Sequence, residues 1–428
     1  MKKYIIYLLF ATFLIASCDK EFTNPGSVDS DRALSSDKAI TAVAIGLQRT
    51  YVSGRLGSLF NTSTISGFVT NEVTLVNAGN IPELQLSTGG NSIDGTNSIL
   101  LNLWTTSNKI IYDADLVISG ATNLGDKGYA SGLIAYATLF KALSIGNMAT
   151  FWEKVPSSTG TNVTFIDRID GYKLAIAAID KALAAATASP ISASFNSAVP
   201  VNLNLVNTLT ALKARYLLFI GDFNNALTTA NAVDLTKPCL LNFDAITLNP
   251  LFEVVTSTNN VYQPRDINLG LPTGLQPDAN DKRIAFYTSL NTTVAPLVRL
   301  RGFFDNSTRS IPLILPGEII LIKAEANARK TPTDLGNSLI ELNKVITKTP
   351  ASDAVGVGAD LPALSGLSQS QLLDQIYKNR CIELYLSGLK LEDMRRFGRP
   401  VAERKRSFFP YPFKERDNNP NTPTDPAF

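Results

Sequence analysis

Histidine is absent from this chain of 428 residues, and cysteine occurs only at positions 18, 239 and 381. Without histidine the chain cannot form a Ser-His-Asp or Cys-His catalytic arrangement or a His-ligated metal site. The three cysteines have no recognisable metal-ligand spacing. We therefore expect no metal held by histidine or cysteine and no cofactor, while a Ca²⁺ ion that supports a loop stays open. Glycoside hydrolysis stays open, because it needs only two carboxyl groups.

Charge is also scarce, at 18% of residues against 45% hydrophobic ones. This composition excludes global disorder and provides a large core, in one big domain or two intertwined ones. Lys plus Arg number 39 and Asp plus Glu 37. Lys2 and Lys3 lie in a segment that we expect to be removed, so the mature chain has 39 − 2 = 37 basic against 37 acidic residues. This balance disfavours nucleic acid as a partner.

The N-terminus has the pattern of a bacterial lipoprotein signal. Lys2 and Lys3 precede an apolar run of about 12 residues, which is too short to span a bilayer and typical of a secretory segment. The run ends in the lipobox-like residues 14–18, LIASC. We predict a signal peptide over 1–17, lipidation of Cys18 and a flexible tether over 18–36. The alternative is a plain secretory signal with an incidental cysteine.

Apolar residues at helical spacing predict a mainly α fold in the remaining segment, 37–428. Trp104 lies at core spacing in one predicted helix, although it could also serve as a platform for stacking sugars. Cys239 and Cys381 are expected to be free and buried, with a disulfide between them as the alternative. The predicted helices cover residues 37–51, 100–119, 128–150, 167–186, 312–329 and 334–347.

Residues 203–238 have the pattern of a tetratricopeptide unit. Ala214, Gly221, Phe223, Ala226 and Pro238 fall at the offsets of a 34-residue repeat. Small residues at 214 and 226 allow two helices to approach closely, and Pro238 ends the second. Since one unit cannot stack alone, the other helices must supply its neighbours, or the segment is an ordinary helical hairpin.

Residues 376–400, IYKNRCIELYLSGLKLEDMRRFGRP, form the most specific pattern in the chain. An apolar stripe predicts a helix that ends at Gly388, followed by a short helix over 391–397. Arg380 and Glu383 are three residues apart, so we expect them to pair. The charges are interpreted as a network that stabilises the fold. Its members are Arg380, Glu383, Asp393, Arg395 and Arg396.

This stretch resembles the C-terminal signature of the SusD/RagB family of outer-membrane nutrient-binding lipoproteins, R-x-x-E-L-x-x-E-G-x-R-x-x-D-L-R-R. Ser387 and Lys390 depart from it, since they stand where the family has Glu and Arg. Weaker likenesses follow in family order, around Trp104, Glu318 and Glu325, and in 408–423. The matching residues of the signature are Arg380, Glu383, Leu384, Gly388, Asp393, Met394, Arg395 and Arg396.

The resemblance implies a tetratricopeptide-like helical scaffold with a loop-rich ligand-binding portion. It also implies a non-catalytic protein that binds glycans or peptides at the cell surface and delivers them to a SusC-like TonB-dependent transporter of the outer membrane. The alternatives are a lipid-anchored glycoside hydrolase and an envelope scaffold without a small ligand.

Two stretches rich in Asn, Ser, Thr, Gly or Pro, 61–98 and 240–310, are expected to be irregular and to form the ligand face. Tyr262 is the first choice among their residues, because Asn259, Asn260 and Gln263 surround it. Ordinary core packing is the alternative for each aromatic ring. The candidate ligand residues are Phe68, Asn71, Asn80, Tyr262, Arg265, Phe286, Tyr287, Arg301, Phe303 and Phe304.

Overall fold

The computed structural model describes residues 36–199, 203–237 and 239–427. The predicted signal peptide, Cys18 and the tether up to residue 35 lie outside this part of the chain. No helix within the described ranges is long and apolar enough to cross a membrane.

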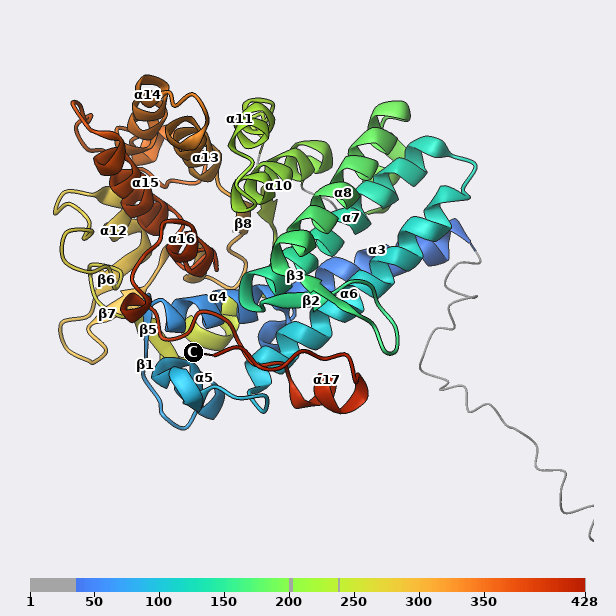
Figure 1. Ribbon diagram of the computed structural model, residues 1–428, viewed down its shortest axis with the longest axis horizontal. Helices are drawn as coiled ribbons and strands as arrows, with labels where there is room; N and C mark the ends of the chain where they lie inside the picture. The colour runs from blue at the N-terminus through green and yellow to red at the C-terminus, as the bar shows by residue number, and fades with distance from the viewer. Residues whose placement is uncertain (1–35, 200–202, 238, 428) are drawn as a thin grey trace, which may run out of the picture.

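An array of packed helices forms the right-hand and upper parts of the molecule in Figure 1. It begins with α3 (Asp37–Val52), α6 (Ser98–Thr122), α7 (Lys127–Phe151) and α8 (Arg168–Ala188), close to the predicted bounds. Asn97 and Asp126 cap α6 and α7 by accepting hydrogen bonds from first-turn amides. α6 packs against α7, and α7 packs against α8.

The array continues in two helical hairpins, α10 (Leu205–Phe219) with α11 (Phe223–Asn231) and α13 (Pro316–Arg329) with α14 (Leu335–Ile346). Ala214 and Ala226 are fully buried, as the repeat pattern predicts. Because α11 also packs against α13, the hairpins stack. The predicted helical scaffold is therefore confirmed. The helix expected from 312 starts later, since 311–314 form a strand, β8 (Ile311–Ile314). A short helix, α9 (Ala193–Ala198), packs on α7.

The C-terminal signature forms α15 (Gln369–Glu383) and α16 (Lys390–Arg396). Ser368 and Gln371 form a capping box at the start of α15. The prediction that this helix runs to Gly388 is wrong, because the chain leaves it at Leu384 and turns through 384–388. An apolar cluster separate from the main core joins α13, α14 and α15.

The prediction that 61–98 is irregular is wrong over its first part. Residues 58–69 form helix α4 (Ser58–Val69), in which every residue is buried. The rest contains the short elements β1 (Val73–Leu75), α5 (Ile81–Thr88) and η2 (Gly90–Ser92), and η1 (Gly54–Leu56) precedes α4. A helix buried on all sides has no polar face, so its sequence shows no helical period.

Residues 240–310 are loop-rich, as predicted, and each of their short strands belongs to a two-stranded antiparallel sheet. β5 (Tyr262–Pro264) pairs with β1, which brings the two predicted ligand regions side by side. β4 (Cys239–Leu241) pairs with β8, and β6 (Thr288–Leu290) with β7 (Val298–Leu300). The other elements of this region are η3 (Phe252–Thr256), α12 (Lys282–Tyr287) and η4 (Gly302–Phe304).

The strands β2 (Lys154–Pro156) and β3 (Phe165–Asp167) form a further antiparallel pair, which follows α7. The short helix η5 (Pro350–Ser352) follows α14. The C-terminal segment contains η6 (Val401–Glu403) and α17 (Phe413–Asn418). Cys239 and Cys381 are both buried and carry free thiols, so the expected unpaired state is confirmed. Burial raises the pKa of Cys381 to about 12.

Candidate functional site

Tyr262, the first choice from the sequence, is fully buried and offers no surface to a ligand. Its ring meets Phe68 edge-on at 5.2 Å, and its hydroxyl lies 3.1 Å from Thr64 Oγ1. Phe68 is equally buried, in α4. The polar neighbours that suggested exposure have structural roles, since Gln263 is itself buried and accepts a hydrogen bond from the Leu300 amide. Tyr262 and Phe68 are therefore core residues, which corrects the prediction.

The other predicted aromatic residues also pack inward. Phe286 is half-buried and contacts Tyr287 and Phe303, each with ring centroids 5.0 Å away. Tyr287 is buried and donates a hydrogen bond to the Glu383 carbonyl. Phe303 and Phe304 are only 5% and 3% exposed and line an internal cavity. These residues form core contacts between the loop-rich region and α15.

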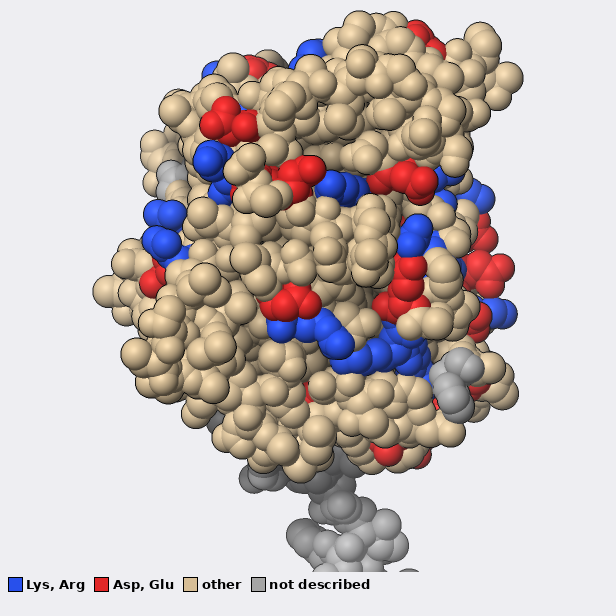
Figure 2. All heavy atoms as spheres, turned by 90° about the vertical axis from the view of Figure 1, so that its left-hand side faces the viewer, with Lys and Arg blue, Asp and Glu red and all other residues tan. Residues whose placement is uncertain are grey.

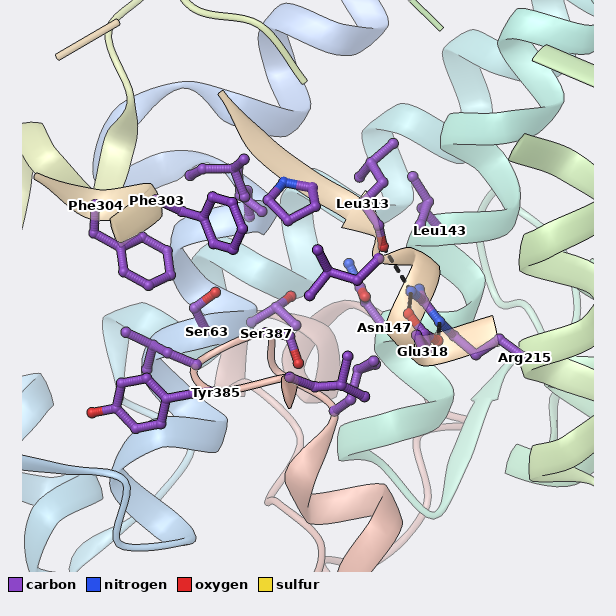
Figure 3. Close-up of a pocket in the computed structure, with 18 of the residues that line it drawn as sticks. Ser63, Leu143, Asn147, Arg215, Phe303, Phe304, Leu313, Glu318, Tyr385 and Ser387 are labelled. Atoms are coloured by element: carbon purple, nitrogen blue, oxygen red, sulfur yellow. Dashed lines mark hydrogen bonds and ion pairs between the residues drawn. The ribbon is translucent and has the colours of Figure 1, made fainter. Parts of the chain in front are cut away.

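The internal cavity, shown in Figure 3, lies between the helical array and the loop-rich region. Phe303 and Phe304 line it opposite a buried ion pair, in which Arg215 contacts both carboxylate oxygens of Glu318 at 2.6 and 2.7 Å. Burial disfavours the charged form of Arg215 and lowers its pKa, but the charge and hydrogen bonds of Glu318 have the larger combined effect, so the pKa of Arg215 is raised. The cavity volume is about 60 Å³, which is too small for a saccharide site.

Of the four predicted polar residues, Asn71 and Arg265 contact each other, whereas Asn80 and Arg301 bond elsewhere. Arg265 Nη1 donates to Asn71 Oδ1 at 3.1 Å, so β1–β5 pairing brings these two side chains together. Asn80 instead accepts a long hydrogen bond of 3.4 Å from Arg55. Arg301 is exposed, and its backbone amide bonds the Tyr287 carbonyl.

An open cleft of about 430 Å³ lies on α6, between the loop that joins β2 to β3 and helix α17. Its volume is within the range of small-molecule sites. One face of α6 forms the floor, because residues 101, 104, 105, 108 and 112 recur at helical spacing. The lining residues are Leu101, Trp104, Thr105, Asn108, Tyr112, Pro156, Ser158, Thr159, Gly160, Val163, Lys414, Glu415 and Asn418.

Hydrogen bonds fix the position of α17 at the side of the cleft. Trp104 Nε1 donates to Glu415 Oε2 at 3.0 Å, and Asn419 Nδ2 donates to Glu415 Oε1 at 2.9 Å. Asn419 Nδ2 also reaches the Val163 carbonyl, at 3.1 Å, in the opposite wall. The cleft is therefore held in shape before any ligand enters.

Groups for ligand contact remain in this cleft. Tyr112 is 49% exposed, so one part of its ring is open to solvent. Asn108 donates through Nδ2 to the Trp104 carbonyl, and within the described residues its Oδ1 accepts no hydrogen bond. Lys414 is exposed and makes no ion pair there. An aromatic face with amide, hydroxyl and ammonium groups is the chemistry that binds a sugar.

Trp104 belongs to the floor of this cleft but exposes almost none of its surface there. It is 2% exposed, with Trp152, Tyr411 and Phe165 packed around its ring at centroid distances of 4.9, 5.7 and 6.2 Å. Its interpretation as a core residue is therefore confirmed.

A second groove, also about 430 Å³, lies against α3 and residues 240–247. The aromatic rings that line it, Tyr136 and Phe243, are both buried. The cleft on α6 is the better candidate, since it combines an exposed ring with polar groups.

Tyr112 is not among the residues predicted from the sequence, because it lies in a helix and the helices are predicted to be scaffold. A signal was present: the buried residues of α6 follow the stripe 103, 107, 110, 114, 117 and 121, and Tyr112 lies outside it. An aromatic residue on the polar face of an amphipathic helix is a candidate for recognition.

The charged residues of the C-terminal signature form buried ion pairs, although not all with the expected partners. Arg380 pairs with Asp393 at 2.9 Å instead of with Glu383. Glu383 points towards α13 and pairs with Arg283 at 3.2 Å and Lys348 at 2.7 Å. The predicted Arg380–Glu383 pair is therefore wrong, because each side chain reaches a more distant segment.

Asp393 is the centre of one part of this network. Arg380 Nε and Arg396 Nη2 donate to its two oxygens at 2.9 and 2.7 Å. Burial favours the protonated form, but the charges and hydrogen bonds of the two arginines outweigh it, so the pKa of Asp393 lies below its ordinary value. Arg396 also bonds Glu325 of α13, and Arg395 pairs with Glu392. The network joins α13, α15 and α16.

No family model and no curated protein matches this chain. Solved structures do. A SusD-like carbohydrate-binding protein from Bacteroides fragilis is 14% identical and superposes with a TM-score of 0.71, over 91% of this chain and 99% of that one. A SusD superfamily protein from Parabacteroides distasonis gives 13% identity and 0.70, over 94% and 100%.

A laminarin-binding SusD-like protein is 15% identical, with a TM-score of 0.61 over 91% of this chain and 98% of that one. The three similarities cover nearly the whole length of each chain. This chain therefore has the SusD-like fold.

Proposed function

We propose that this chain is a non-catalytic saccharide-binding protein of the SusD/RagB type, with one SusD-like domain (37–428). It takes up its ligand in the cleft on α6. The likeness in fold to proteins described as carbohydrate-binding supports the ligand class. The exposed ring of Tyr112, within a preformed cleft of about 430 Å³, carries the proposal.

The lining of the cleft favours binding over hydrolysis. Glu415 is the one carboxylate among the lining residues, and it already accepts hydrogen bonds from Trp104 and Asn419. Hydrolysis of a glycosidic bond ordinarily needs two carboxyl groups on either side of that bond.

The first test is the Tyr112→Ala variant, screened against a glycan array and then titrated with the saccharides that the wild type binds. Loss of an aromatic contact of about 1–1.5 kcal/mol should weaken binding roughly tenfold. The melting temperature should stay unchanged, because the side chain is half exposed. Tyr112→Phe keeps the ring and should retain most of the affinity. Wild-type affinity in the Ala variant would remove Tyr112 from the site.

We further propose that lipid on Cys18 holds the protein at the outer membrane, facing outward, where it passes its ligand to a SusC-like TonB-dependent transporter. The lipobox-like residues 14–18 support this. We expect Cys18→Ala to abolish labelling by a fatty acid and to release the protein from membrane fractions. A neighbouring gene for a large plugged β-barrel would support the transporter as partner. Unchanged labelling and fractionation would contradict the lipid anchor.

A further inference from the structure

Asn71 and Arg265 form the centre of a polar cluster where β1 and β5 meet. Asn71 has a left-handed backbone, with φ of 63°, and its Nδ2 donates to the Glu403 carbonyl at 3.1 Å. Arg265 is exposed and donates through Nη1 to Asn71 Oδ1. Among the described residues, one amide hydrogen of Asn71 and four guanidinium hydrogens of Arg265 are left without an acceptor.

Lys405 lies beside this cluster on a fixed backbone. Its amide donates to the Val69 carbonyl at 2.8 Å, and its carbonyl accepts from the Gly90 amide at 3.1 Å. Gly89 packs so closely that a Cβ atom there would lie 2.4 Å from Lys405 Cβ. Segments 69–71, 89–90 and 403–405 therefore hold the start of this side chain in place.

The carboxylates nearest in sequence are engaged elsewhere. Glu72 is buried and accepts from the Leu386 amide, while Asp266 accepts from the Asn268 and Gly270 amides.

The Glu403 carboxylate binds Arg399 through both oxygens. Within the described residues, neither Arg265 nor Lys405 makes an ion pair.

Arg265 and Lys405 are therefore held near each other, and no carboxylate of the described residues pairs with either of them. Burial and the Arg265 charge together lower the pKa of Lys405 to about 8. A half-buried ammonium group beside a like charge is unfavourable for the folded protein, and such groups gather at binding sites. In Figure 2, Lys and Arg side chains form a band across the lower half of the face where β1 and β5 lie in Figure 1.

We propose that Asn71, Arg265 and Lys405 form a binding site for an oxyanion, the carboxylate or sulfate group of an acidic saccharide. Arginine suits such groups because its planar fork donates two parallel hydrogen bonds to one oxyanion. Lys405 supplies a second positive charge, and Asn71 orients the guanidinium. That the oxyanion belongs to a saccharide rests on the proposed function.

The test compares a galacturonic acid trimer with its methyl ester, which has the same sugar rings without the negative charges. Calorimetric titration of the wild type should show at least tenfold tighter binding of the acid. Lys405→Gln and Arg265→Gln should each remove most of this preference. Arg301→Gln is the matched control, since Arg301 is also exposed and makes no ion pair within the described residues. Equal affinity for acid and ester, together with no preference in the sulfate pair below, would overturn the oxyanion site.

A sulfated galactose trimer and its desulfated form distinguish the two oxyanions. A preference that Lys405→Gln removes in only one pair identifies the group that binds, while a preference unaffected by both variants would refute the site. Inorganic sulfate separates this inference from the proposed function. If sulfate binds the wild type but not Lys405→Gln, and no saccharide binds at all, then the oxyanion site stands and the proposed function fails.

Discussion

Among the described residues, Arg380 has one anionic partner, whereas Asp393 has two cationic ones. Nη1 and Nη2 of Arg380 find no hydrogen-bond acceptor among the described residues, so Asp393 Oδ2 is its only charged contact there. Both side chains are buried. Removing one partner of a buried ion pair leaves an uncompensated charge, which costs about 3–5 kcal/mol.

We therefore predict that Arg380 couples to Asp393 and not to Glu383. In a double-mutant cycle by urea unfolding, Arg380→Met with Asp393→Asn should show a coupling energy of about 0.5–3 kcal/mol. The cycle of Arg380→Met with Glu383→Gln should be additive within about 0.5 kcal/mol. Saccharide affinity of the folded variants should be unchanged. A larger coupling to Glu383 would contradict the observed pairing.

For single residues, the sequence indicates that the charges of the C-terminal signature are structural, but it does not indicate which ion pairs with which. The i, i+3 spacing permits an Arg380–Glu383 pair, yet α16 brings Asp393 to Arg380, and α12 brings Arg283 to Glu383. The prediction that Tyr262 binds ligand is wrong for a related reason. Its polar neighbours are satisfied by strands and turns that only the tertiary structure creates.

Among the elements, α4 is the one that sequence periodicity could not reveal. It carries Ser, Thr and Asn on all sides, and every residue in it is nonetheless buried. Some of these polar groups bond the backbone one turn earlier, as Asn61 does to the Gly57 carbonyl. Amphipathic helices such as α3 and α6 face solvent on one side, which is why their bounds were predicted closely.

The turn after α15 packs against α4 through Gly388. Its φ is +86°, and a Cβ atom there would lie 2.5 Å from Thr62 Cγ2. We predict that Gly388→Ala lowers the free energy of unfolding by about 1–3 kcal/mol, from backbone strain and the clash together. Gly221→Ala is the control, because Gly221 has a φ of +79° but a Cβ atom there would meet no atom within 4 Å among the described residues, apart from its chain neighbours.

Thermal unfolding of the two glycine variants measures the difference. Gly388→Ala should lose clearly more stability than Gly221→Ala, since only the former adds a steric contact. Equal losses would mean that the contact with α4 contributes nothing.

Across the whole molecule, the class of fold was predictable and the position of the ligand site was not. Helix spacing in 203–238 and the signature in 376–400 indicated a repeat scaffold, which depends on local pattern. The cleft on α6 depends on α17, more than 300 residues later in the chain, whose Glu415 contacts Trp104. No local pattern encodes such a contact.

Two buried carboxylic acids, Asp393 and Glu72, should make the free energy of unfolding depend on pH in opposite directions. The lowered pKa of Asp393 means that its contribution is present above the unfolded-state pKa of about 3.9 and is lost as the pH falls below it. Burial raises the pKa of Glu72 from 4.5, against the opposing effects of Lys390 and of hydrogen bonds from Leu386 and Thr70. The stabilisation from Glu72 is therefore complete below pH 4.5, and it is lost as the pH rises through the pKa that Glu72 has in the folded protein.

We predict that urea unfolding between pH 3 and pH 7 shows both slopes. Asp393→Asn should flatten the loss of stability on the acid side, because asparagine does not titrate. Glu72→Gln should instead remove the decline on the side above about pH 4.5 and leave the acid limb as in the wild type. Each variant is the control for the other, since the two carboxylates act in separate pH windows. An Asp393→Asn protein with the full acid-side loss would show that other carboxylates control acid unfolding.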